Sequence, residues 1–121
     1  MTEYKVKVWS NGTKNWYLNG DLHREDGPAC EHANGDKMWF LNGKFHREDG
    51  PAIEYVNGDK EWWLNDKRHR EDGPAIENAN GHKEWWLNGE NLTEKQHQAQ
   101  TQGYASKVIE IDGKKYKLVE A

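Results

Sequence analysis

The heptapeptide His-Arg-Glu-Asp-Gly-Pro-Ala occurs three times in the chain, at 23–29, 46–52 and 69–75. The three copies start at positions 23, 46 and 69, so each lies 23 residues from the next, with no insertion or deletion. A second motif, Asn-Gly-x-Lys-x-Trp-aromatic-Leu-Asn, keeps the same period and begins at Asn11, Asn34, Asn57 and Asn80. A constant period in the twenties predicts a repeat array, in which each unit buries its apolar side chains only against its neighbours.

The repeat unit has the composition of antiparallel β-structure. Residues 2–9 alternate polar and apolar side chains, and Asn-Gly between two such segments is typical of a hairpin turn. The His-Arg-Glu-Asp-Gly-Pro segment is expected to reverse the chain, with Pro fixing φ and Gly supplying a left-handed residue. The predicted fold is an all-β, single-layer antiparallel meander of stacked hairpins over residues 1–89. It comprises a partial repeat at 1–19 and full repeats at about 20–42, 43–65 and 66–88.

The pattern changes after Gly89, and residues 90–121 are expected to cap the array. Thr93 and Gln96 have the spacing of a capping box, which predicts a short helix over about 94–102. Asp112-Gly113 lies between two alternating segments and predicts a terminal hairpin over about 106–119. A repeat array needs such a cap, because an open final strand pairs with other chains.

A two-residue Asn57-Gly58 turn would place Ile53 opposite Trp62 and Ala52 opposite Trp63. Repetition of this register gives two aromatic rows on opposite faces of the sheet. The row expected to form the core carries the leucines beside it and consists of Trp16, Trp39, Trp62 and Trp85. The row expected to lie opposite Ala29, Ala52 and Ala75, as the floor of a groove, consists of Tyr17, Phe40, Trp63 and Trp86. The alternative is that the two faces are exchanged.

Composition limits the classes of function. Only 34% of the 121 residues are hydrophobic, but 7 Trp, 5 Tyr and 2 Phe carry much apolar surface. The net charge of −4, with acids and bases interleaved, disfavours nucleic acid as a partner. No apolar run is long enough for a membrane span, so no membrane association is expected. A single cysteine, Cys30, indicates a reducing compartment, and the expected location is the cytoplasm.

The unit Asn-Gly-x-x-His, followed by Gly, a short strand, a second Asn-Gly and an aromatic strand, resembles the MORN repeat over residues 11–89. It departs from that family where Arg-Glu-Asp-Gly-Pro-Ala replaces a shorter Gly-x-Gly. The Trp-rich version is similar to repeat proteins of tailed bacteriophages and large DNA viruses. The resemblance implies single hairpins stacked into an elongated sheet. It also implies contacts with proteins, and sometimes phospholipids, rather than catalysis.

The repeated heptapeptide contains residue types that occur in metal and catalytic sites, yet neither site is expected. Equivalent residues of successive hairpins lie two strands apart, about 9–10 Å, so His23, His46 and His69 are too far apart to bind one ion. No serine or cysteine recurs with the motif, so we expect no catalytic residue, no metal and no cofactor. A structural role is favoured: Arg paired with an acid of a neighbouring repeat, Asp capping the turn, and His packed over the Gly-Pro step.

The predicted function is non-enzymatic binding. The favoured partner is a protein, and the resemblance suggests a viral protein that binds or inhibits a host factor. The predicted contact residues are the aromatic row Tyr17, Phe40, Trp63 and Trp86, with polar or cationic support from His23, Arg24, His46, Arg47, His69 and Arg70. One alternative is sequestration of a nucleotide-like small molecule on the aromatic groove, and a more distant one is a hydrolase that uses the His-Arg-Glu-Asp turns. An unpaired strand edge at residues 2–9 also permits a homodimer.

Overall fold

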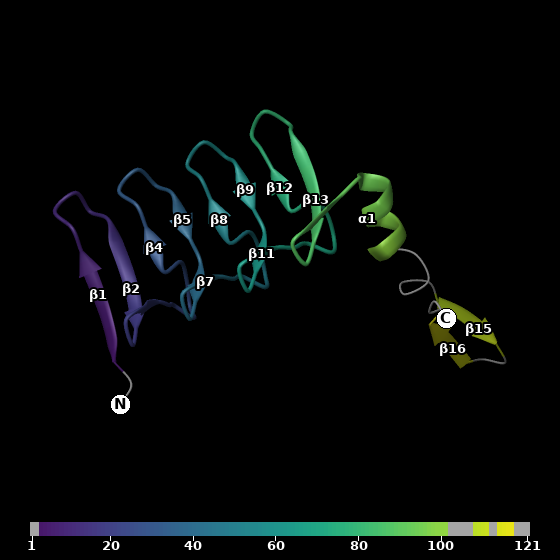
Figure 1. The fold of residues 1–121 in the computed structure, drawn as a ribbon, viewed down its shortest axis with the longest axis horizontal. Coiled ribbons are helices and arrows are strands. Elements are labelled where there is room, and N and C mark those ends of the chain that lie inside the picture. The colour runs from purple at the N-terminus through teal and green to yellow at the C-terminus, as the bar shows by residue number, and fades with distance from the viewer. Residues whose placement is uncertain (1–2, 102–107, 112–113, 118–121) are drawn as a thin grey trace.

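The computed structural model describes residues 3–101, 108–111 and 114–117. It confirms the all-β prediction: the chain forms an open antiparallel sheet of hairpin-linked strands with one short helix near its C-terminal end. Successive hairpins stand side by side along the array, and the helix follows the last of them (Figure 1).

Most strands belong to one ten-stranded sheet. Nine of them follow the order β1-β2-β4-β5-β8-β9-β12-β13-β14. They are β1 (Tyr4–Val8), β2 (Lys14–Leu18), β4 (Cys30–Glu31), β5 (Lys37–Met38), β8 (Ile53–Glu54), β9 (Lys60–Glu61), β12 (Ile76–Glu77), β13 (Lys83–Leu87) and β14 (Glu90–Leu92). The tenth strand, β3 (Asp21–Leu22), pairs with β2. Two separate two-stranded sheets are formed by β6 (Phe40–Leu41) with β7 (Lys44–Phe45) and by β10 (Trp63–Leu64) with β11 (Lys67–Arg68).

The chain reverses at the Leu-Asn-Gly step and not at the heptapeptide. Asn42 and Gly43 both have positive φ, at 51° and 78°, as the central residues of a type I′ turn do. The strand that returns from this turn is interrupted: His46 donates its N–H to the Trp39 carbonyl at 3.1 Å, and the Trp39 N–H donates to the Ala52 carbonyl at 2.7 Å. The heptapeptide is therefore a loop pushed out of the returning strand, and the prediction that it reverses the chain is wrong.

The opposite turn, at Asn57-Gly58, also differs from the prediction. Gly58 alone has positive φ, at 98°, and its N–H donates to the Tyr55 carbonyl at 2.9 Å. This geometry is a type I turn followed by a left-handed glycine, which makes a three-residue loop. Ile53 consequently pairs with Glu61 instead of Trp62, so the predicted register is wrong by one residue.

In the observed register the alanines lie opposite the first aromatic row and not, as predicted, the second. Trp39 and Trp62 donate their backbone N–H groups to Ala52 and Ala75, each at 2.7 Å, so the alanines share a face with the first tryptophan row. All eight aromatic side chains of the two rows are half-buried, so the prediction that the first row forms the core is wrong. The buried hydrophobic residues are Ala29, Cys30, Ala52, Ile53, Ala75, Ile76 and Leu92. Ala29, Ala52 and Ala75 are each 0% exposed.

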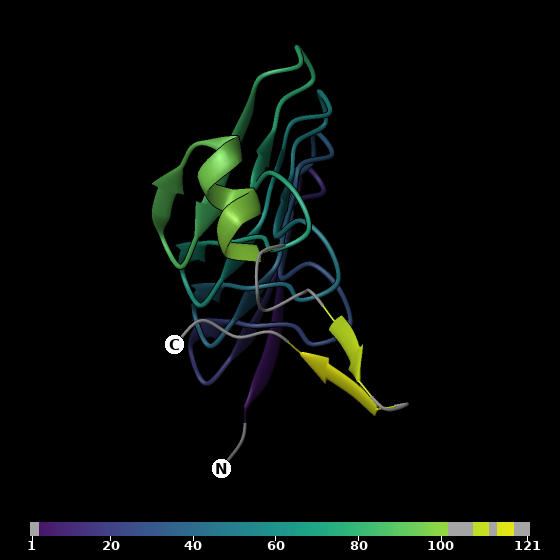
Figure 2. The same cartoon turned by 90° about the vertical axis from the view of Figure 1, so that its right-hand side faces the viewer.

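Helix α1 (Glu94–Thr101) packs against β13 and β14 at the end of the array (Figure 2). The predicted capping box is confirmed: the Gln96 N–H donates to Thr93 Oγ1 at 3.1 Å, and the Thr93 N–H donates to Gln96 Oε1 at 3.0 Å. β15 (Val108–Ile111) and β16 (Lys114–Lys117) pair as a separate antiparallel two-stranded sheet. The Asp112-Gly113 turn and the ends of the predicted hairpin, at 106–107 and 118–119, lie outside the described residues.

Candidate functional site on two faces of the sheet

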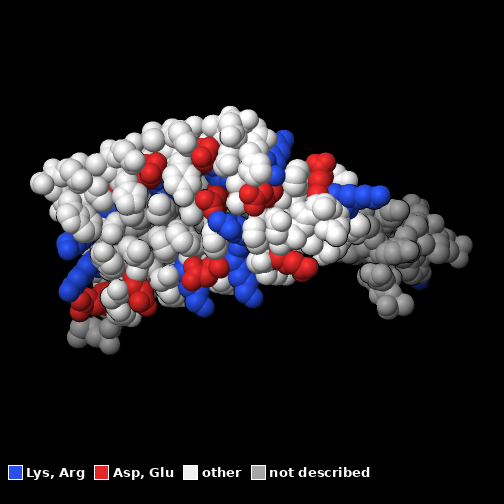
Figure 3. Space-filling view, turned by 45° about the horizontal axis from the view of Figure 1, so that its top comes forward, with Lys and Arg blue, Asp and Glu red and all other residues white. Residues whose placement is uncertain are grey.

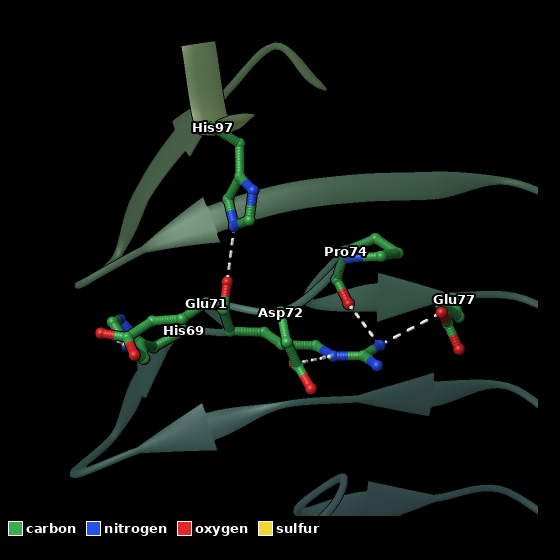
Figure 4. Close-up of polar contacts among 7 residues, drawn as sticks. His69, Glu71, Asp72, Pro74, Glu77 and His97 are labelled. Atoms are coloured by element: carbon green, nitrogen blue, oxygen red, sulfur yellow. Dashed lines mark hydrogen bonds and ion pairs between the residues drawn. The ribbon is translucent and has the colours of Figure 1, made fainter. Parts of the chain in front are cut away.

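The arginine of each heptapeptide organises its own loop. In the third loop, Arg70 Cζ lies 3.9 Å from the centre of the Trp62 ring. Its Nε donates to Asp72 Oδ1 at 2.8 Å, and its Nη1 donates to the Pro74 carbonyl at 3.1 Å and to Glu77 Oε1 at 3.1 Å (Figure 4). Arg24 and Arg47 make the equivalent contacts in the first two loops. The acids thus belong to the arginine's own loop and following strand, and the predicted pairing with a neighbouring repeat is wrong.

The glycine of the heptapeptide makes room for this arginine. A Cβ built on Gly50 would lie 2.9 Å from Arg47 Cζ, and the same distance recurs at Gly27 and Gly73. None of these three glycines has a positive φ, so the expected left-handed residue does not occur here. The motif requires glycine because of the close approach of the guanidinium group.

The histidine joins one repeat to the next. Its Nδ1 atom accepts the backbone N–H of the following type I′ turn, from Asn42 to His23 at 2.9 Å and from Asn65 to His46 at 3.1 Å. An Nδ1 atom that accepts leaves the ring proton on Nε2, which faces Glu25 Oε1 at 3.4 Å in the first loop. The side chains are 6%, 13% and 12% exposed for His23, His46 and His69, respectively.

Each heptapeptide residue except the glutamate therefore has a structural task, and the predicted cationic contact residues are largely withdrawn from the surface. The arginine side chains are only 19–24% exposed. The outer rim of each loop is formed instead by its two acids, of which Glu48 is 82% and Asp49 87% exposed. We call the face of the sheet that carries the three heptapeptide loops, with Trp39 and Trp62 between them, the loop face. The exposed rim of its loops is acidic rather than basic.

The loops enclose grooves on the loop face. One groove, of about 720 Å³, lies between the second and third loops and has Trp62 and Leu64 among its lining residues. Its equivalent between the first and second loops measures about 670 Å³ and has Trp39 and Leu41 in the same places. Figure 3 shows acidic and basic side chains interspersed among uncharged residues, with no large basic area in that view.

The opposite face, hereafter the aromatic face, carries a continuous stack along the array. The Phe40 and Phe45 rings lie 4.3 Å apart, and Phe45 and Trp63 lie 5.3 Å apart. Arg68 Cζ then lies 4.9 Å from the Trp63 ring and 5.1 Å from the Trp86 ring. The structure thus brings together three of the four predicted contact residues, through Phe45 and Arg68.

Phe45 and Arg68 were missed from the sequence, although they occupy one position of the repeat. The residue in that position changes from Leu22 to Phe45 to Arg68, each facing an aromatic residue across its hairpin. Tyr17, the remaining predicted residue, pairs with Leu22, and its hydroxyl accepts the Asn15 amide at 3.2 Å. A comparison of hairpin partners between repeats is the signal that could have found this position.

Polar groups fix the rings at the C-terminal part of this face. Glu61 Oε1 accepts Trp63 Nε1 at 3.1 Å and Arg68 Nε at 3.4 Å. Glu84 accepts His82 Nε2 at 2.9 Å and Trp86 Nε1 at 3.0 Å, and these two hydrogen bonds hold the pKa of Glu84 below its ordinary value. Both indole rings are therefore held in defined orientations.

The two faces differ in how they vary from repeat to repeat. On the loop face, the tryptophan, leucine and complete heptapeptide recur unchanged. On the aromatic face, equivalent positions change in size and charge: Asn15, Met38, Glu61 and Glu84 form one row, and Leu22, Phe45, Arg68 and Asn91 form another. A face that differs in each repeat presents a unique surface.

Among the described residues no group of histidine, cysteine and acidic side chains could hold a metal ion, and no helix there is long and apolar enough to cross a membrane. Comparisons of the chain with protein-family models, curated proteins and solved structures found no match. The resemblance to MORN repeats accordingly stays a prediction from the repeat pattern.

Proposed function

We propose that the chain is a non-enzymatic binding scaffold that contacts a protein partner through its aromatic face. The observation that carries the proposal is the difference between the two faces. Apart from the glutamate of each heptapeptide, repetition of the loop face is explained by the contacts that build each repeat, whereas no such requirement explains the changes at Phe45, Arg68 and Glu61. Variation within a rigid repeat framework is how one surface acquires specificity for one partner.

The residues on this face have the chemistry of a protein interface. Tryptophan, tyrosine and arginine contribute most to binding energy in protein complexes, especially where their orientation is fixed before binding. Trp63 and Trp86 meet this condition because Glu61 and Glu84 hold their indole N–H groups. Arg68 adds a cation between the two rings.

A nucleotide-like ligand is the second candidate, and the structure offers it less support. Such a ligand favours a concave pocket with converging cations. The two equivalent grooves are rimmed by acids, and the nearby arginines already donate to acids of their own loops. For an enzyme, three loops with the same internal contacts provide no single preorganised centre. The proposed partner is thus a protein, in the cytoplasm of the host cell if the viral resemblance holds.

The test is native mass spectrometry of tagged protein recovered from host-cell lysate. Two variants probe the aromatic face, Trp63→Ala and Arg68→Ala, and Lys37→Gln with Lys60→Gln is the control on exposed positions of the loop face. We expect a protein at fixed stoichiometry with the wild type and the control, and its loss with both aromatic-face variants. Circular dichroism must show that the variants are folded. Retention of the partner by both folded variants would refute the proposal, and a few hundred daltons of extra mass would favour the small ligand.

A further inference from the structure

The grooves of the loop face combine an apolar floor with an acidic rim. The groove between the second and third loops contains Trp62, Leu64 and Pro51 beside four carboxylates, those of Glu48, Asp49, Glu71 and Asp72. The carboxylate side chains are 78–87% exposed. Arg47 and Arg70 lie lower in the same groove, stacked on tryptophan rings and only 22% and 19% exposed. Asp49 and Asp72 already accept from these arginines, so the carboxylates left for an incoming group are those of Glu48 and Glu71, with apolar surface beside them.

The glutamates are the part of the heptapeptide that its internal contacts explain least. Within the described part of the chain, the polar partner of each glutamate is its own histidine, at 3.4 Å for Glu25 and Glu48 and 3.6 Å for Glu71. Exposed pairs at such distances contribute little to stability. Every loop carries this glutamate although it contributes little to the stability of the fold. Its recurrence therefore indicates a ligand that contacts every loop in the same way.

The spacing of the loops restricts the conformation of that ligand. Successive loops are separated by two strands of the sheet, which corresponds to about 9.4–9.8 Å. A polyproline II helix rises about 3.1 Å per residue with three residues per turn, so it presents every third side chain on one side at intervals of about 9.3 Å. A β-strand advances about 9.9 Å in three residues, but its third residue points to the opposite side. Of these two extended conformations, polyproline II is the one that keeps both the spacing and the side.

We propose that the loop face binds a protein segment in the polyproline II conformation, with lysine or arginine at every third position, that runs along the array. Each cation would enter one groove, with its aliphatic stem against the leucine and tryptophan that line it and its charged group between the two glutamates of that groove, because the two aspartates already accept from Arg47 and Arg70 in the groove between the second and third loops. The chain offers two equivalent grooves between three loops, so two cations three residues apart are the minimal ligand. This site goes beyond the proposed function and lies on the other face of the sheet.

The test compares two synthetic peptides of identical composition. The matched peptide is (Arg-Pro-Pro)4, and the control is (Arg-Arg-Pro-Pro-Pro-Pro)2, which has the same charge and proline content without the three-residue period. Binding is measured by fluorescence anisotropy of labelled peptide at low and at physiological ionic strength, because rim charges are screened by salt. We expect the matched peptide to bind about tenfold more tightly, since both grooves are filled at once. Equal binding of the two peptides, or no binding of either, would overturn the proposal.

Variants locate the site. Glu48→Gln with Glu71→Gln should abolish the tenfold difference, whereas Asp21→Asn with Glu90→Gln, two exposed acids outside the grooves, makes the same change in charge and should preserve it. Persistence of the difference in the folded Glu48→Gln, Glu71→Gln protein would place the peptide elsewhere. Trp63→Ala should leave peptide binding unchanged, so failure of the aromatic-face proposal and failure of this one give different results.

Discussion

The Nδ1 atom of His23 accepts a hydrogen bond at 2.9 Å from the backbone N–H of Asn42, the first central residue of the next repeat's turn. This contact recurs from His46 to Asn65 and from His69 to Asn88. It ties the loop of one repeat to the turn of the next. The array is therefore held together partly by one side chain per repeat.

We expect His23→Ala to lower the free energy of unfolding by about 2 kcal/mol, because it removes a buried side chain and its acceptor. His82→Ala is the control, since His82 is 54% exposed and lies outside the loops, and it should cost below about 0.5 kcal/mol. Urea denaturation measures both. Equal losses for the two variants would contradict the role of histidine as the link between repeats.

The close approach of Gly50 to Arg47 predicts an energetic coupling. Gly50→Ala should destabilise the wild type by about 1–2 kcal/mol, because its Cβ would lie 2.9 Å from a guanidinium that the loop holds in place. In an Arg47→Ala background the same substitution should cost below about 0.5 kcal/mol, and a double-mutant cycle gives the difference. Gly81→Ala, where no atom lies within 4 Å, is the control and should cost the same in both backgrounds. Additive effects of Gly50 and Arg47 would show that the glycine serves another purpose.

The repeat and the meander could be predicted from the sequence because the same turn and strand residues recur every 23 residues along the array. The register could not, because Asn-Gly suits both a two-residue turn and a three-residue loop. Asn42-Gly43 forms the first and Asn57-Gly58 the second, and the difference follows from how the neighbouring strands pair. The capping box was recognised because Thr93 and Gln96 satisfy each other locally.

The site was partly predictable for the same reason. Phe40, Trp63 and Trp86 stand out as aromatic residues, whereas Phe45 and Arg68 share only a position across the hairpin, which depends on the turn between them. The arginines were predicted as contact residues because the sequence alone does not show that Arg47 stacks on Trp39, the tryptophan that precedes its loop. Charge at a repeated position is as consistent with internal contacts as with binding.

The two kinds of turn predict different sensitivities of stability to an asparagine-to-glycine substitution. Asn42→Gly should change the free energy of unfolding by no more than about 0.5 kcal/mol, because Asn42 already has φ of 51° and its N–H is retained for His23. Asn57→Gly should cost about 1 kcal/mol, because Asn57 Oδ1 accepts the Asp59 N–H at 2.9 Å and the unfolded chain gains freedom. Thermal denaturation compares the two variants. Greater tolerance at Asn57 would contradict the turn assignment.

Cys30 occupies the place that Ile53 and Ile76 hold in the next repeats, and all three are buried. Cys30→Ile should therefore stabilise the protein by about 0.5–1.5 kcal/mol, since it adds apolar surface to a site that the neighbouring repeats fill with isoleucine. Cys30→Ser, which adds a polar group of similar size, should destabilise it. Urea denaturation of both variants is the measurement. Destabilisation by isoleucine would mean that the space around the side chain of residue 30 is smaller than at Ile53 and Ile76.

Asp72 predicts a pH dependence of known sign. Its pKa lies below the ordinary value of 3.8, chiefly because its carboxylate accepts a hydrogen bond from Arg70, to which the charges of Arg70 and His97 add. A carboxyl with a lower pKa in the folded state stabilises the fold above pH 3.8, and this contribution is lost as the pH falls through the lowered pKa. An NMR titration of the Asp72 carboxyl carbon should show a midpoint below 3.8 in the wild type, rising toward that value in Arg70→Gln. A wild-type midpoint at or above 3.8 would show that the Arg70–Asp72 hydrogen bond does not persist in solution.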